Sequence, residues 1–273
     1  MCRSTTILAG LFTLAAVPLI IHMLVAVASS KLRNWFEGLA GAALTTLWCS
    51  AAWAGPPFLT DDPEPVEFKH WEFYAATQWV AARHSGYATS PHIEVNYGAL
   101  PGLQLHAIVP AALAWTSGSA VEYGPGDIEL GAKLRFIEES EWRPQVGIFP
   151  LLTLPTGAKP RGLGAGSVEG LVPIWIQKSF GHWTTYGGGG VHFAPDGDAA
   201  VVGWLLQREL SKTLALGAEA FMTVPRRGEA VQVQANLGAV INLSELHHVL
   251  ISAGPSFGTD AVMQAYLAYQ LTI

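Results

Sequence analysis

The sequence predicts an all-β protein: a closed antiparallel transmembrane β-barrel of about twelve strands, preceded by an N-terminal signal segment. Three observations indicate this class. Apolar and polar residues alternate with period 2 in repeated segments of about ten residues. The links between these segments alternate between short and long. The chain is 50% hydrophobic, is rich in glycine, and is only 13% charged, against about 25% in ordinary soluble domains.

Residues 1–54 are expected to form an apolar leader that contains a signal peptide. Basic residues at Lys31 and Arg33 precede a short apolar stretch at 39–47. The sequence Ala52-Trp53-Ala54 then supplies small residues at both positions that a signal peptidase reads, directly before Gly55. Export across the inner membrane of a Gram-negative bacterium follows from this arrangement.

A second apolar run, Ile7–Ala28, lies upstream and approaches the length needed to span a bilayer. Three interpretations remain open at this point: a true start at Met23, one long export signal, or a membrane anchor. Cys49 could be read as a lipidation site, but Trp48 stands where a small residue is wanted. We therefore favour cleavage after Ala54.

Composition excludes several classes of function. The formal net charge of -6 lacks the positive excess that binding to nucleic-acid phosphates requires. The two cysteines, Cys2 and Cys49, both fall in the leader, so we expect no thiolate metal site, disulfide or cysteine nucleophile after export. No cofactor is expected.

Twelve segments carry the strand pattern after residue 55. Each is bounded by Gly, Pro, Asp or Ser, the residues typical of turns. An even number of strands lets both barrel ends lie on one side of the membrane. The segments are 68–80, 91–98, 103–115, 127–137, 144–154, 168–179, 183–193, 200–210, 214–224, 230–243, 247–254 and 262–273.

The alternation predicts which side chains face the lumen. In segment 127–137, apolar residues such as Leu130 and Leu134 share one face, whereas Glu129, Lys133 and Arg135 share the other. A strand with this pattern can separate lipid from a polar interior. By the same parity we expect the lumen to be lined by Glu72, Glu94, Glu129, Lys133, Arg135, Gln177, Glu219, Gln232, Gln234, Asn236 and Gln270, with Gln207 and Glu209 in the wider set.

Link lengths predict the topology. Short links fall near residues 101, 139, 181, 211 and 245, and mostly longer links fall at 81–90, 116–126, 155–167, 194–199, 225–229 and 255–261. Outer-membrane barrels have short periplasmic turns and long external loops. We therefore expect a short periplasmic segment at 55–66, a barrel at 67–273, and both barrel termini in the periplasm.

The tryptophans after residue 55 fall near strand ends more often than strand centres. Aromatic residues at that depth form girdles at the two membrane interfaces. We expect such girdles from Trp71, Trp79, Trp115, Trp142, Trp175, Trp183 and Trp204.

Several stretches resemble a family of bacterial outer-membrane barrels described as transporters, some linked to the phenol meta-cleavage pathway. The resemblance spans nearly all of 55–273 and is carried by motifs that include GPPFLTDDP at 55–63, WEFY at 71–74, GDIELGAK at 126–133, PLLTLPTG at 150–157, QKS at 177–179 and WTTYGGGG at 183–190. It implies the barrel fold and transport, but it transfers no catalytic or binding residue.

The function expected from the sequence is therefore an outer-membrane channel or transporter for small molecules, with aromatic or apolar ones among the candidates. Its partners would be the lipid bilayer, the barrel-assembly machinery and an unidentified solute. No enzymatic activity is expected. Two alternatives stay open: a lipid-modifying barrel enzyme using residues such as His106, His192 and Ser252, and a plugged structural or adhesive barrel.

The Asp61-Asp62 pair is not expected to hold a metal. A Ca²⁺ site needs six or more oxygen ligands, and the surrounding sequence does not supply them. Flanking prolines favour a turn.

Overall fold

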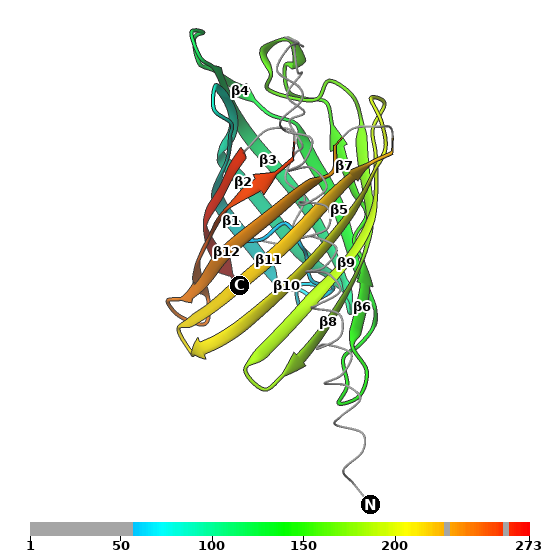
Figure 1. Ribbon diagram of the computed structural model, residues 1–273. Helices are drawn as coiled ribbons and strands as arrows, with labels where there is room; N and C mark the ends of the chain where they lie inside the picture. Colours follow the sequence, from blue (N-terminus) through cyan, green and yellow to red (C-terminus); the bar gives the residue numbers. More distant parts are fainter. Residues whose placement is uncertain (1–56, 227–229, 259–261) are drawn as a thin grey trace, which may run out of the picture. The chain divides into compact units, whose positions relative to one another are not determined.

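The computed structural model describes residues 57–226, 230–258 and 262–273, which consist almost entirely of strands (Figure 1). The predicted leader and its cleavage site lie outside these residues. Among the described residues, no helix is long and apolar enough to cross a membrane. The strands are β1 Trp71–Ala81, β2 Ser85–Leu100, β3 Leu103–Thr116, β4 Glu122–Pro125, β5 Ile128–Ile137, β6 Gln145–Ile148, β7 Leu151–Leu154, β8 Glu169–Phe180, β9 Trp183–Phe193, β10 Ala199–Ser211, β11 Leu214–Pro225, β12 Gln232–Asn242, β13 His247–Phe257 and β14 Val262–Thr272.

The strands form one closed antiparallel barrel. Each strand pairs with its neighbours in sequence order, and β14 pairs with β1 from Thr272–Glu72 to Met263–Ala81. Strands β4 and β5 both pair with β3, and β6 and β7 both pair with β5 and β8. Each of these two pairs therefore forms one interrupted strand of the wall. The predicted closed barrel of twelve strands is confirmed, since pairing of β14 with β1 joins the first and last strands of the wall. The short strand β4 pairs with β3 alone.

The links divide the barrel into two ends. The links after β2, β8, β10 and β12 are short, and they lie at the same end as the start of β1 and the end of β14. At that end the Trp71 amide donates to the Ile273 carbonyl at 2.7 Å. The opposite end carries the longest described link, residues 155–168, which includes the 3₁₀ turn Lys159–Arg161. We call these the short-link end and the long-link end.

One strand is longer than the alternation indicates. The sequence predicts a link over 81–90, but β2 begins at Ser85. Gly86 and Tyr87 pair with Trp115 and Ala114 of β3. The turn-forming residues of this stretch are thus held in the sheet by neighbours on both sides, which local sequence does not reveal.

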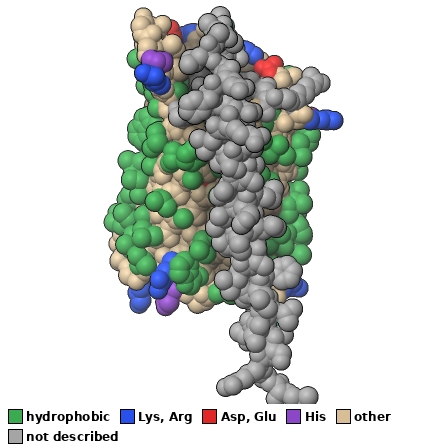
Figure 2. Space-filling view, viewed as in Figure 1, with side chains coloured by type: hydrophobic (Ala, Val, Ile, Leu, Met, Phe, Trp, Pro, Cys, Tyr) green, Lys and Arg blue, Asp and Glu red, His purple; other side chains and the backbone are tan. Residues whose placement is uncertain are grey.

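The outer surface is a band of apolar side chains, seen as the green belt between the two charged ends in Figure 2. Leu105 and Val109 of β3, Leu134 of β5, and Ile174 and Ile176 of β8 are all exposed on this surface. Their neighbours at alternate positions are buried. An exposed apolar belt on a closed barrel is the surface that a lipid bilayer covers.

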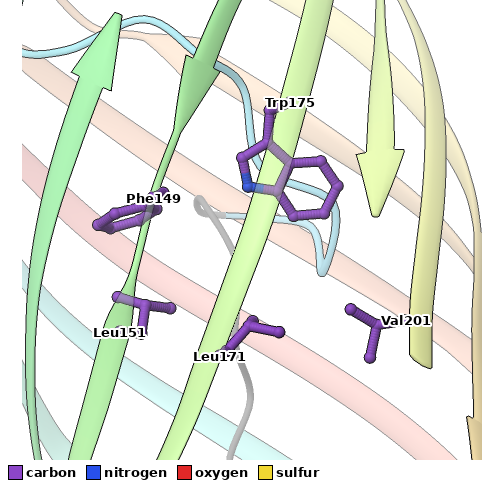
Figure 3. Close-up of a cluster of buried hydrophobic side chains, with 5 residues drawn as sticks. All are labelled: Phe149, Leu151, Leu171, Trp175 and Val201. Atoms are coloured by element: carbon purple, nitrogen blue, oxygen red, sulfur yellow. The ribbon is translucent and has the colours of Figure 1, made fainter. Parts of the chain in front are cut away.

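The inner surface includes a cluster of apolar side chains from β7, β8 and β10. Leu151, Leu171, Trp175 and Val201 point into the barrel beside Phe149 (Figure 3). Trp175 is only 2% exposed, so the interface girdle predicted for it is wrong. Trp71, Trp79 and Trp183, in contrast, are exposed near strand ends. The strand parity places Trp175 inward, beside Pro173 and Gln177.

Candidate functional site

Residues 57–66, which we call the inner segment, run inside the barrel. The Ser252 hydroxyl of β13 donates to the Pro57 carbonyl, and the Thr60 amide donates to the Glu219 carboxylate of β11. Farther along, the Val66 amide donates to Oε1 of Gln104 on β3 at 2.9 Å. One short segment can reach β13, β11 and β3 only from within the barrel. The sequence predicts a short periplasmic segment at 55–66, and the contacts of residues 57–66 with these strands are a finding of the structure.

Glycines in the wall make room for the start of the inner segment. A Cβ added at Gly217 of β11 would lie 2.6 Å from the Phe58 ring, and one at Gly238 of β12 would lie 2.7 Å from it. At Gly203 of β10 an added Cβ would collide with Thr60. Three neighbouring strands thus each present an inward position without a side chain where the segment passes. We call this surface the glycine wall.

A buried ion pair holds the middle of the inner segment. Lys133 Nζ of β5 lies 2.9 Å from Asp61 Oδ1 and 3.5 Å from Asp62 Oδ1. The same ammonium is 3.4 Å from the Glu64 carbonyl oxygen and lies over the Phe149 ring. A buried ammonium needs such compensation because desolvation costs several kcal/mol. Lys133 therefore satisfies its charge only while the inner segment is in place.

Beside Lys133, the wall carries a network of polar side chains on β2, β3 and β5. The His106 Nδ1 lies 2.7 Å from Asn96 Oδ1, and its Nε2 lies 3.2 Å from Glu129 Oε1. The Asn96 amide in turn donates to Glu94 at 2.8 Å. Asn96 stands directly opposite His106 in the register, and Gly131 stands opposite it on the other side. The strand register thus places Asn96 beside His106, and Gly131, which has no side chain, leaves space for the His106 ring on its other side. We call the wall formed by β2, β3, β5 and β6 the charged wall.

A second network lies on the glycine wall. The Asn236 amide donates to Glu219 Oε2 at 2.6 Å, and the Gln234 amide donates to Asn236 Oδ1 at 2.9 Å. Because Glu219 also accepts the Thr60 amide, this network is bonded to the inner segment. Both sides of the lumen thus have their polar side chains satisfied partly by the segment that passes between them.

Two cavities lie inside the barrel. The larger has a volume of about 540 Å³ and is bordered by the inner segment, Glu72, Tyr74, Gln177 and Gln270. The smaller, of about 50 Å³, is bordered by apolar residues such as Ile108 and by polar ones such as Thr153. Glu94 and His106 line the larger cavity, whereas His92 and Glu129 line the smaller one. The network around His106 therefore stands between the two.

The structure places the predicted lumen residues in three environments. Glu94, Glu129, Lys133, Gln177, Glu219, Gln234 and Asn236 are buried. Glu72, Arg135 and Gln270 are half-buried, and Gln232 is exposed at the start of β12, as is Glu209 near the end of β10. Arg135 contacts Glu64 at 3.4 Å and Gln145 at 3.3 Å. The larger cavity brings together Glu72, Glu94, Lys133, Gln177, Gln207 and Gln270. Whether they line a solute path stays a prediction.

Sequence reasoning considered Asp61 and His106 for other roles and left them, with Asn96, out of the predicted lumen set. Asn96 and His106 share the inward parity of Glu94 and Gln104, so strict alternation could have found them. Asp61 could not be found in this way, since it belongs to no strand. No group of three or more His, Cys, Asp or Glu side chains in the described part of the chain is arranged to hold a metal ion.

The three residues considered for a lipid-modifying enzyme each contact a different set of partners. His106 contacts Asn96 and Glu129, and His192 Nε2 lies 3.3 Å from Glu169 Oε2. The Ser252 hydroxyl donates to the Pro57 carbonyl. A serine nucleophile needs a base within hydrogen-bond reach, and this hydroxyl instead anchors the inner segment.

Comparison with known proteins finds similar structures but no similar family or curated sequence. No protein-family model matches the chain, and no curated protein sequence matches it either. Among solved structures, the COG4313 outer membrane channel from Pseudomonas putida F1 has a TM-score of 0.63 at 15% identity, covering 78% of this chain and 98% of that one.

Two further barrels are similar in fold. The translocator domain of the autotransporter NalP from Neisseria meningitidis has a TM-score of 0.53 at 12% identity and covers 74% of this chain and 88% of that one. The KdgM porin, in complex with disordered oligogalacturonate, has a TM-score of 0.50 at 7% identity and covers 74% of this chain and 98% of that one. At such identities the likeness shows the fold, which includes channels and a translocator domain.

Proposed function

We propose that this chain is an outer-membrane channel that passes small molecules through a lumen narrowed by the inner segment. The observation that carries the proposal is the cavity of about 540 Å³ lined by polar side chains inside a barrel with an apolar outer belt. Cavities of roughly 300–1,000 Å³ are the size that binds small molecules. The similar channel and porin structures support this function.

The solute must be small because the inner segment occupies part of the cross-section. Apolar contacts are offered by the Trp175 and Phe149 cluster and by Phe58 with Tyr186 and Leu205. These surfaces support the expectation that aromatic or apolar molecules are among the solutes. Membership of the transporter family that the sequence resembles is part of the same proposal.

The proposal also includes location and orientation. The short-link end, with both barrel termini, would face the periplasm, and the long-link end would face outward, as in other outer-membrane barrels. Residues 1–54 would be an export leader. The barrel-assembly machinery would insert the barrel, and the apolar belt would then contact lipid.

A matched pair of variants tests the channel in liposomes. We expect protein purified from outer membranes to let small neutral solutes enter and swell the liposomes. Gln177→Trp adds bulk at the larger cavity and should reduce swelling, whereas the outward-facing neighbour Ile176→Trp should not. A folded barrel that admits no solute, or equal effects of the two variants, would reject the proposal.

A plugged structural or adhesive barrel is the second candidate. The observation in its favour is the inner segment itself, which is bonded to several strands and buries Phe58 and Asp61. It predicts a folded barrel without solute entry in the same liposome assay. A lipid-modifying enzyme has no such support, since Ser252 is bonded to Pro57.

A further inference from the structure

The larger cavity has a strong excess of acidic side chains. Among the described residues that line it, Lys133 is the one lysine, none is an arginine, and two are histidines, His70 and His106. Such an imbalance in a low-dielectric enclosure focuses a negative potential on the space within it. The carboxylates that line the cavity are Asp61, Asp62, Glu64, Glu67, Glu72 and Glu94.

Nearby cations offset only part of this charge. The Lys133 ammonium lies between Asp61 and Asp62, and the Arg135 guanidinium lies 3.4 Å from Glu64 Oε1. Two positive charges therefore face three of the six carboxylates. Glu72 accepts a hydrogen bond from the neutral Tyr74 hydroxyl at 2.8 Å. Glu94 likewise accepts from the neutral Asn96 amide, with the His106 ring 3.6 Å away. Neutral donors orient these carboxylates without cancelling their charge.

Asp61 adds an acceptor that the protein does not use. Its side chain is 2% exposed and lines the cavity. Oδ1 accepts from Lys133 and from the Asp62 amide, but Oδ2 is buried without a hydrogen-bond partner among the described residues. Buried carboxylate oxygens are normally bonded, so Oδ2 is an acceptor left for a ligand in the cavity.

We propose that the larger cavity selects small positively charged solutes, monovalent cations or alkylammonium groups, with Asp61 Oδ2, Glu72 and Glu94 as the acceptors. This inference rests on the proposed channel function and specifies the charge of what that channel passes. Rings of carboxylates select cations in other channels by the same electrostatics. The apolar clusters farther along the wall remain available to the carbon part of an ammonium solute.

Reversal potentials in planar bilayers under a KCl gradient test the charge preference. For protein purified from outer membranes, we expect K⁺ to be favoured over Cl⁻ by a factor on the order of 10, the lower range of electrostatic focusing. Glu72→Gln keeps the shape and a hydrogen-bonding group but removes one charge, so it should lower that ratio by about twofold or more. Glu141→Gln, exposed in the link after β5, is the matched control and should leave the ratio unchanged.

The outcomes separate this inference from the proposed function. Conductance without cation preference would overturn the charge preference and leave the channel intact. A cation preference that Glu72→Gln leaves unchanged would overturn its assignment to this cavity. A barrel that conducts nothing would reject the channel, and calorimetric titration with ethylammonium, against ethanol as the neutral match, then decides the site. Saturable ethylammonium binding that Glu72→Gln weakens supports it, and equal heats for the two probes overturn it.

Discussion

The inner segment meets two walls of the barrel by different physical means. On the glycine wall, the contact is one of shape: Gly203, Gly217 and Gly238 leave space that Phe58 and Thr60 fill. On the charged wall, Lys133 holds Asp61 by a buried ion pair. The difference teaches that the ion pair with Asp61 comes from β5, whereas the space for Phe58 comes from β11 and β12. The two contributions can therefore be removed independently.

The largest effect is expected on the charged wall, from Lys133→Met. Removing the ammonium leaves Asp61 buried without its cation, which typically costs about 3–5 kcal/mol of unfolding free energy. Urea unfolding of the barrel in phospholipid vesicles measures this cost. The double variant Lys133→Met/Asp61→Asn should recover most of the loss because the buried carboxylate is then replaced by a neutral amide. Asp62, the second partner of Lys133, has a side chain that is 35% exposed and can be solvated.

Lys178→Met is the matched control for this comparison. Lys178 pairs with Glu139 at 2.9 Å near the short-link end, where both side chains are partly exposed. Such pairs contribute about 0–1 kcal/mol. Equal losses for the two lysine variants would mean that the charged wall does not hold the inner segment.

An intermediate effect is expected on the glycine wall, from Gly217→Ala. The three heavy atoms nearest to the added methyl group would all belong to the Phe58 ring, and overpacking of this kind costs about 1–3 kcal/mol. Phe58→Ala in the same background should relieve part of the clash, giving a coupling free energy in a double-mutant cycle. Gly170→Ala of β8 is the control, since its added Cβ would make an ordinary contact at 3.6 Å. Absence of coupling would show that Phe58 does not occupy this wall.

The smallest effect is expected from Ser252→Ala, at the Pro57 end of the inner segment. The variant removes one hydrogen bond to the Pro57 carbonyl, and a single bond of this kind contributes about 1 kcal/mol. The same urea titration measures it. Ser211→Ala, an exposed hydroxyl near Thr213, should change stability by less than about 0.5 kcal/mol. A loss of unfolding free energy for Ser252→Ala as large as that for Lys133→Met would contradict the expected ranking, in which the buried ion pair contributes more than this hydrogen bond.

Much of the barrel could be predicted because strand alternation is local. The apolar face of residues 128–136 and the polar face with Glu129 and Lys133 lie as the period-2 pattern indicates. The start of β2 could not be predicted, because Ser85 to Ser90 carry turn-forming residues that pairing with β3 overrides. Trp175 is a different case: its residue type favours an interface, but strand parity, which is itself a local pattern, places it inside.

The sequence by itself determined the fold class, the number of wall strands and most inward positions, because side chains on a strand alternate between its faces whatever lies elsewhere in the chain. Only the tertiary structure decided that residues 57–66 enter the lumen. Their partners, Lys133, Gly217, Gly238 and Ser252, lie far along the chain. A contact between distant residues is specified by closure of the barrel and by its register, which no local pattern records.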